Sequence, residues 1–250
     1  MTPDDEAIQA ASPALWSALS KLGRAVNQPV HFLPLQTAEA RGKPFNATIG
    51  QITDGHGKAV PLPTLAAALG GLSDEARSRA VLYSPVEGLA ELRQAWKERQ
   101  AHRVPSTLPI VTVGAQQGRA LVGDLFIEEG RIVVSQPDDL FGLPEGEPVV
   151  AFLEDRDALL RAAGRGPVVA VVDELFEDLV DLHENLVPIR VEEAPLQVGF
   201  LTFPFPADSA IAVALEKKVK MLLRAQVGSP SAAMQVVLLE ALRQRSQSSS

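Results

Sequence analysis

Six short apolar runs between residues 108 and 203 constrain the fold of this chain more than any other feature. Each run has five or six residues and is rich in Val, Ile or Leu, with turn residues around it. Such runs suit strands that are buried on both faces of a mostly parallel sheet. Helical stretches between them, such as 115–127 and 156–163, provide the crossovers that parallel strands need. We therefore predict an α/β fold with a mixed, mostly parallel sheet flanked by helices. The expected strands cover residues 108–113, 131–135, 148–152, 167–172, 186–191 and 198–203.

The rest of the chain divides around this block. Residues 1–63 are expected to form an N-terminal arm and helix, because apolar side chains recur at helical spacing from Trp16 to Val26 after a start at Ser12-Pro13. Residues 64–205 are the predicted large domain, and 206–250 a reduced helical C-terminal part that ends in a disordered tail from Ser246. Further helices are expected at residues 64–69, 89–102, 208–227 and 231–245.

Composition and charge exclude several classes of protein. A net charge of −8 over 250 residues argues against nucleic acid, since neutralising phosphates needs clustered Lys and Arg. Cysteine is absent, which excludes disulfides and thiolate chemistry and fits a reducing cytoplasm. Residues 1–6 are acidic, unlike a secretory signal, and no apolar run approaches the roughly 20 residues of a membrane span. We expect a cytoplasmic protein with no nucleic-acid, membrane or metal partner.

Three stretches carry residues that can bind a ligand. In 112–117, Gly114 lies where a strand meets a helix, and the amide groups of such a helix start can hold a phosphate. In 169–174, Asp173 ends a buried strand at the sheet edge where ligands gather. This carboxylate can pair with a cationic ring nitrogen or a metal, or it can cap the next helix. The third stretch, 83–93, is a turn that leads into a helix, and it also has a purely structural interpretation.

In this order, these stretches resemble the fold-type-I, pyridoxal-phosphate-dependent aminotransferases of class I/II. The resemblance runs from about residue 10 to 242, is densest up to Phe141, and rests on the ordered set rather than on one motif. The matching segments are 45–50, 83–93, 108–117, 124–126, 137–142, 172–176 and 198–203.

The resemblance implies roles around a bound cofactor. Residues 114–116 match the loop that cradles the cofactor phosphate, and Tyr83 matches a tyrosine that reaches the phosphate of a neighbouring subunit, which implies a dimer. Asp173 matches the carboxylate that keeps the pyridine nitrogen protonated, so that the ring acts as an electron sink. Phe141 lies near the position of an aromatic side chain that stacks on the ring. The implied cofactor-binding residues are Tyr83, Gly114, Ala115, Gln116, Phe141, Asp173 and Phe176.

The chain departs from the family at the residue on which transamination depends. The family's lysine forms the internal aldimine and then shuttles the proton. It lies between strands that correspond to 167–172 and 198–203, yet no lysine occurs here from Lys97 until Lys217. Arg190 cannot replace it, because a guanidinium stays protonated. We expect no catalytic residue of this kind.

Two other groups of charged residues in this half of the chain are interpreted as structural rather than functional. Lys217, Lys218 and Lys220 fall on a predicted amphipathic helix, where we expect a solvent-facing surface. The neighbouring pair Glu192-Glu193 is interpreted as solvated turn charge.

Further departures concern the cofactor and substrate contacts. The family's Asn-Pro-x-Gly segment has no counterpart between Phe141 and Pro167, and Phe176 stands where a tyrosine donates to the cofactor hydroxyl. Gln197 replaces an arginine that binds the phosphate, a contact worth roughly 1.5–3 kcal/mol. From the resemblance we also expect most of the small domain, which supplies the arginine for the substrate carboxylate, to be missing from this sequence.

These features predict an aminotransferase-like protein that is catalytically inactive, a pseudoenzyme that acts through ligand or protein binding. Its expected partner is a second copy or a complete homologue. The alternative is a divergent transferase that still binds pyridoxal phosphate and uses another base. A deletion relic with no activity of its own is the third hypothesis.

Overall fold

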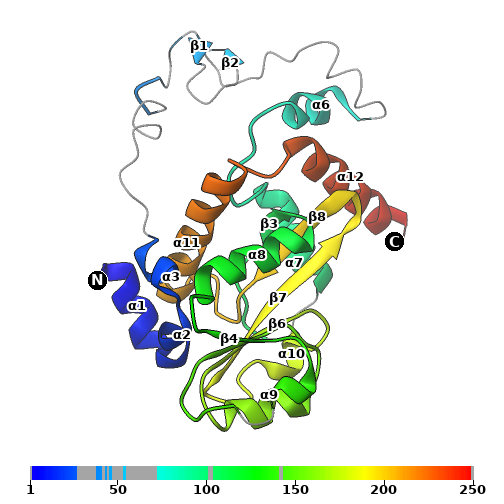
Figure 1. Ribbon diagram of the computed structural model, residues 1–250. Coiled ribbons are helices and arrows are strands. Elements are labelled where there is room, and N and C mark those ends of the chain that lie inside the picture. Colours follow the sequence, from blue (N-terminus) through cyan, green and yellow to red (C-terminus); the bar gives the residue numbers. More distant parts are fainter. Residues whose placement is uncertain are drawn as a thin grey trace.

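A six-stranded sheet forms the centre of the molecule, with helices on both faces (Figure 1). The computed structural model describes residues 2–26, 38–40, 43, 45–46, 53–54, 72–100, 104–140 and 143–248. All six predicted strands are present, which confirms the α/β class. They are β3 (Ile110–Val113), β4 (Ile132–Val134), β5 (Val149–Ala151), β6 (Val168–Val172), β7 (Leu186–Ala194) and β8 (Val198–Thr202).

The strand order is β3-β8-β7-β6-β5-β4. Strands β4 to β7 are parallel, whereas β8 is antiparallel to both of its neighbours. The short connection explains this exception: only Pro195–Gln197 lies between β7 and β8, and antiparallel strands alone can be joined so tightly. Leu196 and Gln197 both have positive φ in this turn (68° and 55°).

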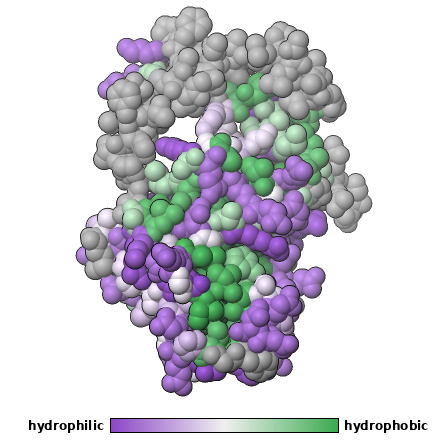
Figure 2. Space-filling model, viewed as in Figure 1, coloured by the Kyte–Doolittle hydropathy of each residue, from purple (hydrophilic) through white to green (hydrophobic). Residues whose placement is uncertain are grey.

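Alternate residues of the strands enter two separate cores, as expected for a sheet buried on both faces. On one face Val169, Val171 and Val191 pack with α8 (Gly114–Phe126) and α11 (Ala210–Gln226). On the other face Val168 and Val172 pack with α9 (Arg156–Ala163) and α10 (Phe176–Leu179). Figure 2 shows apolar residues gathered below α8 in this view, between hydrophilic ones.

A third core lies where α7 (Ala90–Gln100) and α12 (Ala232–Ser248) cover the end of the β7–β8 hairpin. Leu92 and Trp96 of α7 meet Phe200 of β8 there. The Trp96 and Phe200 rings stack with centroids 4.2 Å apart and planes 12° apart. This packing fixes the position of the hairpin relative to α7.

The N-terminal segment differs from the prediction. One helix was expected up to Val26, but the chain forms three: α1 (Pro3–Ala11), α2 (Pro13–Ala18) and α3 (Lys21–Ala25). Each helix starts after a hydroxyl side chain, that of Thr2, Ser12 or Ser20, which accepts a hydrogen bond from the backbone N–H three residues further on. The caps divide the segment into three helices. The apolar periodicity continues across these breaks, so it does not reveal them. Helix α1 was not predicted, and it packs against α11.

The remaining helices mostly follow the prediction. Helix α6 (Asp74–Ala80), which starts at the Ser73 cap, was not predicted. Helix α12 continues through Ser248, so the tail predicted to be disordered from Ser246 is helical over its first three residues. A small antiparallel pair, β1 (Phe45–Asn46) and β2 (Thr53–Asp54), lies within the segment 1–63 that was predicted as an arm and a helix. The helix predicted at 64–69 lies outside the described residues. No described helix has both the length and the apolar character to cross a membrane.

Candidate functional site at the carboxyl edge of the sheet

The start of helix α8 holds a carboxylate from the same chain. Gly114 opens the helix with φ +71°, a conformation that favours glycine, and no side chain caps the helix from Val113. The Ala115 N–H donates to the Glu193 carboxylate. Both carboxylate oxygens lie 3.3–3.4 Å from the point that a Cβ on Gly114 would occupy. The positive end of the helix dipole is therefore satisfied internally by an anion.

The turn before α8 rests directly on strand β8. A Cβ on Gly199 would overlap the Gly114 carbonyl group and the Thr112 hydroxyl, so only glycine allows this approach. The Thr112 hydroxyl donates to the Gly114 carbonyl oxygen at 2.9 Å. One turn further on, the Gln117 side chain accepts from the Val113 N–H at 2.7 Å, whereas Gln116 is exposed. The turn is thus fixed by β8, against which it packs, and by hydrogen bonds from Thr112 and to Gln117.

Asp173 follows β6 and pairs with Arg190, the residue at the end of the β6–β7 pairing. The Arg190 Nε lies 3.1 Å from the Asp173 Oδ1, and the Asp173 side chain is 48% exposed. Asp173 does not cap the next helix, because α10 has no side-chain cap. The Glu154 carboxylate instead accepts from the backbone N–H groups of Asp173 and Leu175. The sequence left open a ring nitrogen, a metal or a helix cap as the role of Asp173. In the structure its partner is instead Arg190, a cation of the same chain.

Glu192 is buried beside this pair. Its carboxylate accepts from Trp96 Nε1 at 3.1 Å and from Gln100 Nε2, and it lies 3.1 Å from the Arg190 guanidinium. Burial raises the pKa of the Glu192 carboxyl, and Arg190, Trp96 and Gln100 offset this only in part. Asp173 raises the pKa further through its like charge.

The interpretation of Glu192-Glu193 as solvated turn charge was therefore wrong. Glu192 is a buried acceptor, and Glu193, although exposed, binds the start of α8. The missed signal was the period-two alternation of β7, which continues past Val191 and sends the two carboxylates to opposite faces of the sheet.

The other predicted site residues lie elsewhere. Tyr83 is 43% exposed, with its hydroxyl 2.7 Å from the point that a Cβ on Gly228 would occupy. Phe176 is fully buried in the core that Val168 and Val172 form with α9 and α10. Phe141 lies outside the described residues. The structure therefore brings together two separate pairs, Ala115 with Glu193 and Asp173 with Arg190.

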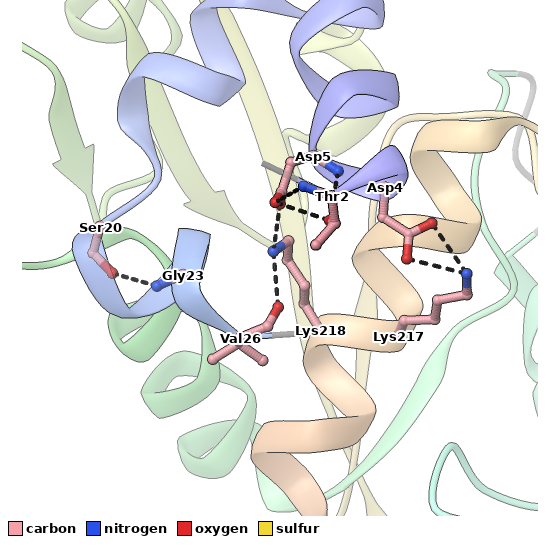
Figure 3. A network of polar contacts seen from close by, with 8 residues as sticks. All are labelled: Thr2, Asp4, Asp5, Ser20, Gly23, Val26, Lys217 and Lys218. Atoms are coloured by element: carbon pink, nitrogen blue, oxygen red, sulfur yellow. Dashed lines mark hydrogen bonds and ion pairs between the residues drawn. The ribbon is translucent and has the colours of Figure 1, made fainter. Parts of the chain in front are cut away.

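The lysines after Lys97 have partners of their own. Lys218 is 2% exposed and lies 3.0 Å from the Asp5 carboxylate, and it donates to the Val26 carbonyl at 2.8 Å (Figure 3). Lys217 pairs with Asp4 at 3.1 Å and Lys220 with Glu87 at 3.0 Å. The expected solvent-facing surface was wrong for Lys218, because α1 covers that side of α11.

Lys97 on helix α7 is also engaged. Its amine donates to the Ser106 carbonyl at 2.6 Å, and burial lowers its pKa. In the described part of the chain, none of the contacts made by Lys97, Lys217, Lys218 or Lys220 belongs to the edge formed by Gly114 and Asp173. Nor do the described residues contain a group of three His, Cys, Asp or Glu suited to a metal.

No protein-family model and no curated protein matches this chain by sequence. Solved structures match it in three dimensions. An aminotransferase from Anaerococcus prevotii superposes with a TM-score of 0.56 and 14% identity, over 89% of this chain and 75% of that one. This chain has the aminotransferase fold. The resemblance stated from the sequence is confirmed at the level of the fold.

Two further aminotransferases superpose less closely. The aromatic-amino-acid aminotransferase of Burkholderia pseudomallei, covalently bound to pyridoxal phosphate, gives a TM-score of 0.43 at 16% identity, over 90% of this chain and 77% of that one. Candida albicans Aro8 gives 0.46 at 15% identity, over 67% of this chain and 52% of that one. This chain thus spans between about half and three-quarters of the length of these proteins.

As they are arranged here, the residues of the carboxyl edge do not fit pyridoxal phosphate. A phosphate at the Ala115 N–H would meet the Glu193 carboxylate, and like charges repel. A protonated ring nitrogen at Asp173 would compete with Arg190, which already pairs with the Oδ1 of that carboxylate. The amines of Lys97, Lys217, Lys218 and Lys220 all bind groups away from this edge, so none of these described lysines donates an amine for an aldimine there.

Proposed function

We propose that this protein has the aminotransferase fold without the transamination reaction, and that it acts by binding a protein partner. One observation carries the first half of the proposal. Between Asp173 and β8, the segment where the aminotransferase lysine is expected, the chain has no lysine, and Arg190 pairs with Asp173. A guanidinium remains protonated at every physiological pH and cannot form a Schiff base.

Exposed apolar side chains near the same edge support the second half. Val113 precedes the start of α8, Leu196 is in the β7–β8 turn, and Val227 follows α11; each is 43–47% exposed. Contacts connect their positions, since Val113 pairs across the sheet with Val198 and Gln117 binds Gln226. Apolar groups gathered around one edge are typical of a protein interface. The partner is a second copy of the chain or a complete homologue.

The chemistry is tested by titrating the purified full chain with pyridoxal phosphate, followed by borohydride reduction and mass spectrometry. We expect no saturable absorbance band and no single modified lysine, whereas a complete aminotransferase treated in parallel gives both. A saturable band with one reduced lysine, at Lys217, Lys218 or Lys220, would overturn the proposal. The divergent-transferase alternative would then hold.

The partner is tested by light scattering coupled to sizing. We expect twice the 26.7 kDa chain mass, or a stable complex when a complete homologue is added. Leu196→Asp should dissociate either complex, because it places a charge in the proposed interface. Leu22→Asp is the matched control, since Leu22 is 50% exposed but belongs to α3 at the N-terminal side. A monomer that captures no homologue contradicts the binding proposal and leaves the chemical one standing.

A further inference from the structure

We propose that strand β7 carries built-in replacements for the two charges that a pyridoxal phosphate would bring to this edge. Glu193 replaces the phosphate at the start of α8, and Arg190 replaces the ring cation at Asp173. The inference goes beyond the proposed function, because it holds whether or not a protein partner binds. It explains how the charges at the carboxyl edge of the sheet are balanced by side chains of the same chain, without a cofactor.

The anionic replacement rests on the start of α8. This helix has 13 residues, so its first turn presents unpaired N–H groups and the positive end of a full dipole. The Glu193 carboxylate accepts from Ala115 and lies against the Gly114 turn, on the side where a Cβ would project. A second anion at this position would be repelled by the first.

The cationic replacement rests on the end of β6. Asp173 follows the last residue of that strand, and the guanidinium of Arg190 reaches it from the neighbouring strand at 3.1 Å. The same guanidinium contacts Glu192 at 3.1 Å, so Arg190 is held from two sides and its side chain is only 17% exposed. A ligand cation at the Asp173 Oδ1 would therefore have to share that oxygen with a guanidinium that is already held in place.

The extension of β7 explains why one strand serves both positions. Pairing with β6 ends at Val172 and Arg190, but β7 continues to Ala194 against β8 alone. Successive side chains alternate between the faces of a strand. Arg190 and Glu192 therefore share the Trp96 side, while Glu193 follows Val191 to the side of α8, where a Cβ on Gly118 would lie 2.9 Å from Val191. Gly199, opposite Glu193, leaves room for the Gly114 turn.

The test uses pyridoxine 5′-phosphate, which has the ring and the phosphate but no aldehyde, so that its binding does not depend on a lysine. Its affinity for four full-length proteins is measured by calorimetry: wild type, Glu193→Ala, Arg190→Gln and the double variant. We expect no measurable binding to wild type and saturable binding to Glu193→Ala, with the dissociation constant at least tenfold lower than the wild-type limit. The double variant should bind more tightly than either single variant, because both counter-charges have been removed.

Controls separate this inference from changes in folding and from the proposed function. Glu145→Ala removes an exposed glutamate in another loop and should leave binding undetectable. Far-ultraviolet circular dichroism and thermal melting confirm that each variant is folded, and Glu193→Gln replaces Glu193→Ala if the latter is not. Binding to wild type as tight as to Glu193→Ala would overturn the inference, as would folded variants that gain no affinity. Neither result bears on whether the protein forms an aldimine or binds a partner.

Discussion

Asp5 and Glu192 are two carboxylates with almost the same burial, 3% and 7% exposed, whose pKa values shift in opposite directions. Burial raises the pKa of Asp5, but hydrogen bonds from Thr2 and Lys218 outweigh it and the net shift is downward. Burial also raises the pKa of Glu192, and there the opposing contacts are not sufficient. Low exposure alone therefore does not set the charge state of a carboxyl group in this protein.

Two differences act together: Asp5 accepts hydrogen bonds from the Thr2 backbone N–H and hydroxyl, and the two carboxylates share their cations differently. Lys218 lies between the Asp5 carboxylate and a neutral carbonyl, so its charge is directed to one acid (Figure 3). Arg190 is divided between Glu192 and Asp173, and the Asp173 charge itself disfavours ionised Glu192. The first cluster is a structural connection between α1 and α11. The second retains an unbalanced charge at a sheet edge, as functional sites often do.

The comparison predicts its largest effect at Lys218. Lys218→Ala leaves the buried Asp5 charge without its cation, which costs about 3–5 kcal/mol of unfolding free energy. Urea denaturation followed by circular dichroism measures this loss. Lys217→Ala is the matched control, because its pair with Asp4 is more than one-third exposed and should contribute about 1 kcal/mol or less. Equal losses in the two variants would mean that Lys218 has no special role.

The next effect is expected at Arg190. Arg190→Ala removes the cation shared by Glu192 and Asp173, and the loss of charged hydrogen bonds to a buried carboxylate costs about 1.5–3 kcal/mol. The double variant Arg190→Ala/Glu192→Gln should regain a large part of this stability, since a neutral amide needs no cation. Chemical denaturation of both variants measures the recovery. No recovery in the double variant would mean that Glu192 was not the group left unpaired.

The dependence on pH should have opposite signs at the two carboxylates. The Asp5 pKa is below its usual 3.8 in the folded state, so this group stabilises the fold above pH 3.8 and loses that contribution as the pH falls through the folded value. The Glu192 pKa is above its usual 4.5, so its contribution is complete below pH 4.5 and is lost as the pH rises through the folded value.

Asp5→Asn and Glu192→Gln isolate these two contributions. The stability of wild type relative to Asp5→Asn should increase with pH in the acid range, and that relative to Glu192→Gln should decrease over the range above pH 4.5. Urea unfolding at a series of pH values measures both differences. If both stability differences changed with pH in the same direction, the opposite pKa shifts of Asp5 and Glu192 would be contradicted.

The smallest effect concerns Asp173. Its side chain is half exposed, so Asp173→Asn should change the unfolding free energy by about 1 kcal/mol or less. It should also lower the pKa of Glu192, because a like charge is removed and Arg190 is no longer shared. Carbon-13 NMR titration of the Glu192 carboxyl measures this change. An unchanged or higher pKa would show that sharing the cation is not what distinguishes Glu192 from Asp5.

Sequence patterns predicted the sheet well because its strands carry their signal locally. Each is a compact apolar run, and β6 is buried at every position. Helices α1 and α6 were missed because they are short and their start signals span only a few residues, the Thr2–Asp5 capping box and the Ser73 cap. The burial of Lys218 was also missed, although it lies three and four positions from Leu215 and Leu222 on the buried stripe of α11. That spacing was the available signal.

The site was predictable only in part. Gly114 and Asp173 stand at strand ends, where a local pattern identifies them. Their partners Glu193 and Arg190 come from far along the chain, and their contacts depend on how far β7 extends beyond β6. No run of neighbouring residues encodes that extension, because it depends on the pairing of β7 with β8. The acidic pair therefore resembled an ordinary charged turn.

The central position of β8 has a consequence for the order of assembly during translation. Among the described strands, β3 pairs with β8 alone, although β8 is the last strand to be synthesised. The parallel block from β4 to β7 can form, with α8 packed against β7, before β3 has a strand partner. Contacts between segments so distant in sequence form slowly. The nascent chain therefore carries an apolar strand without a strand partner until Thr202 has been synthesised, and unpaired strands of this kind promote aggregation during folding.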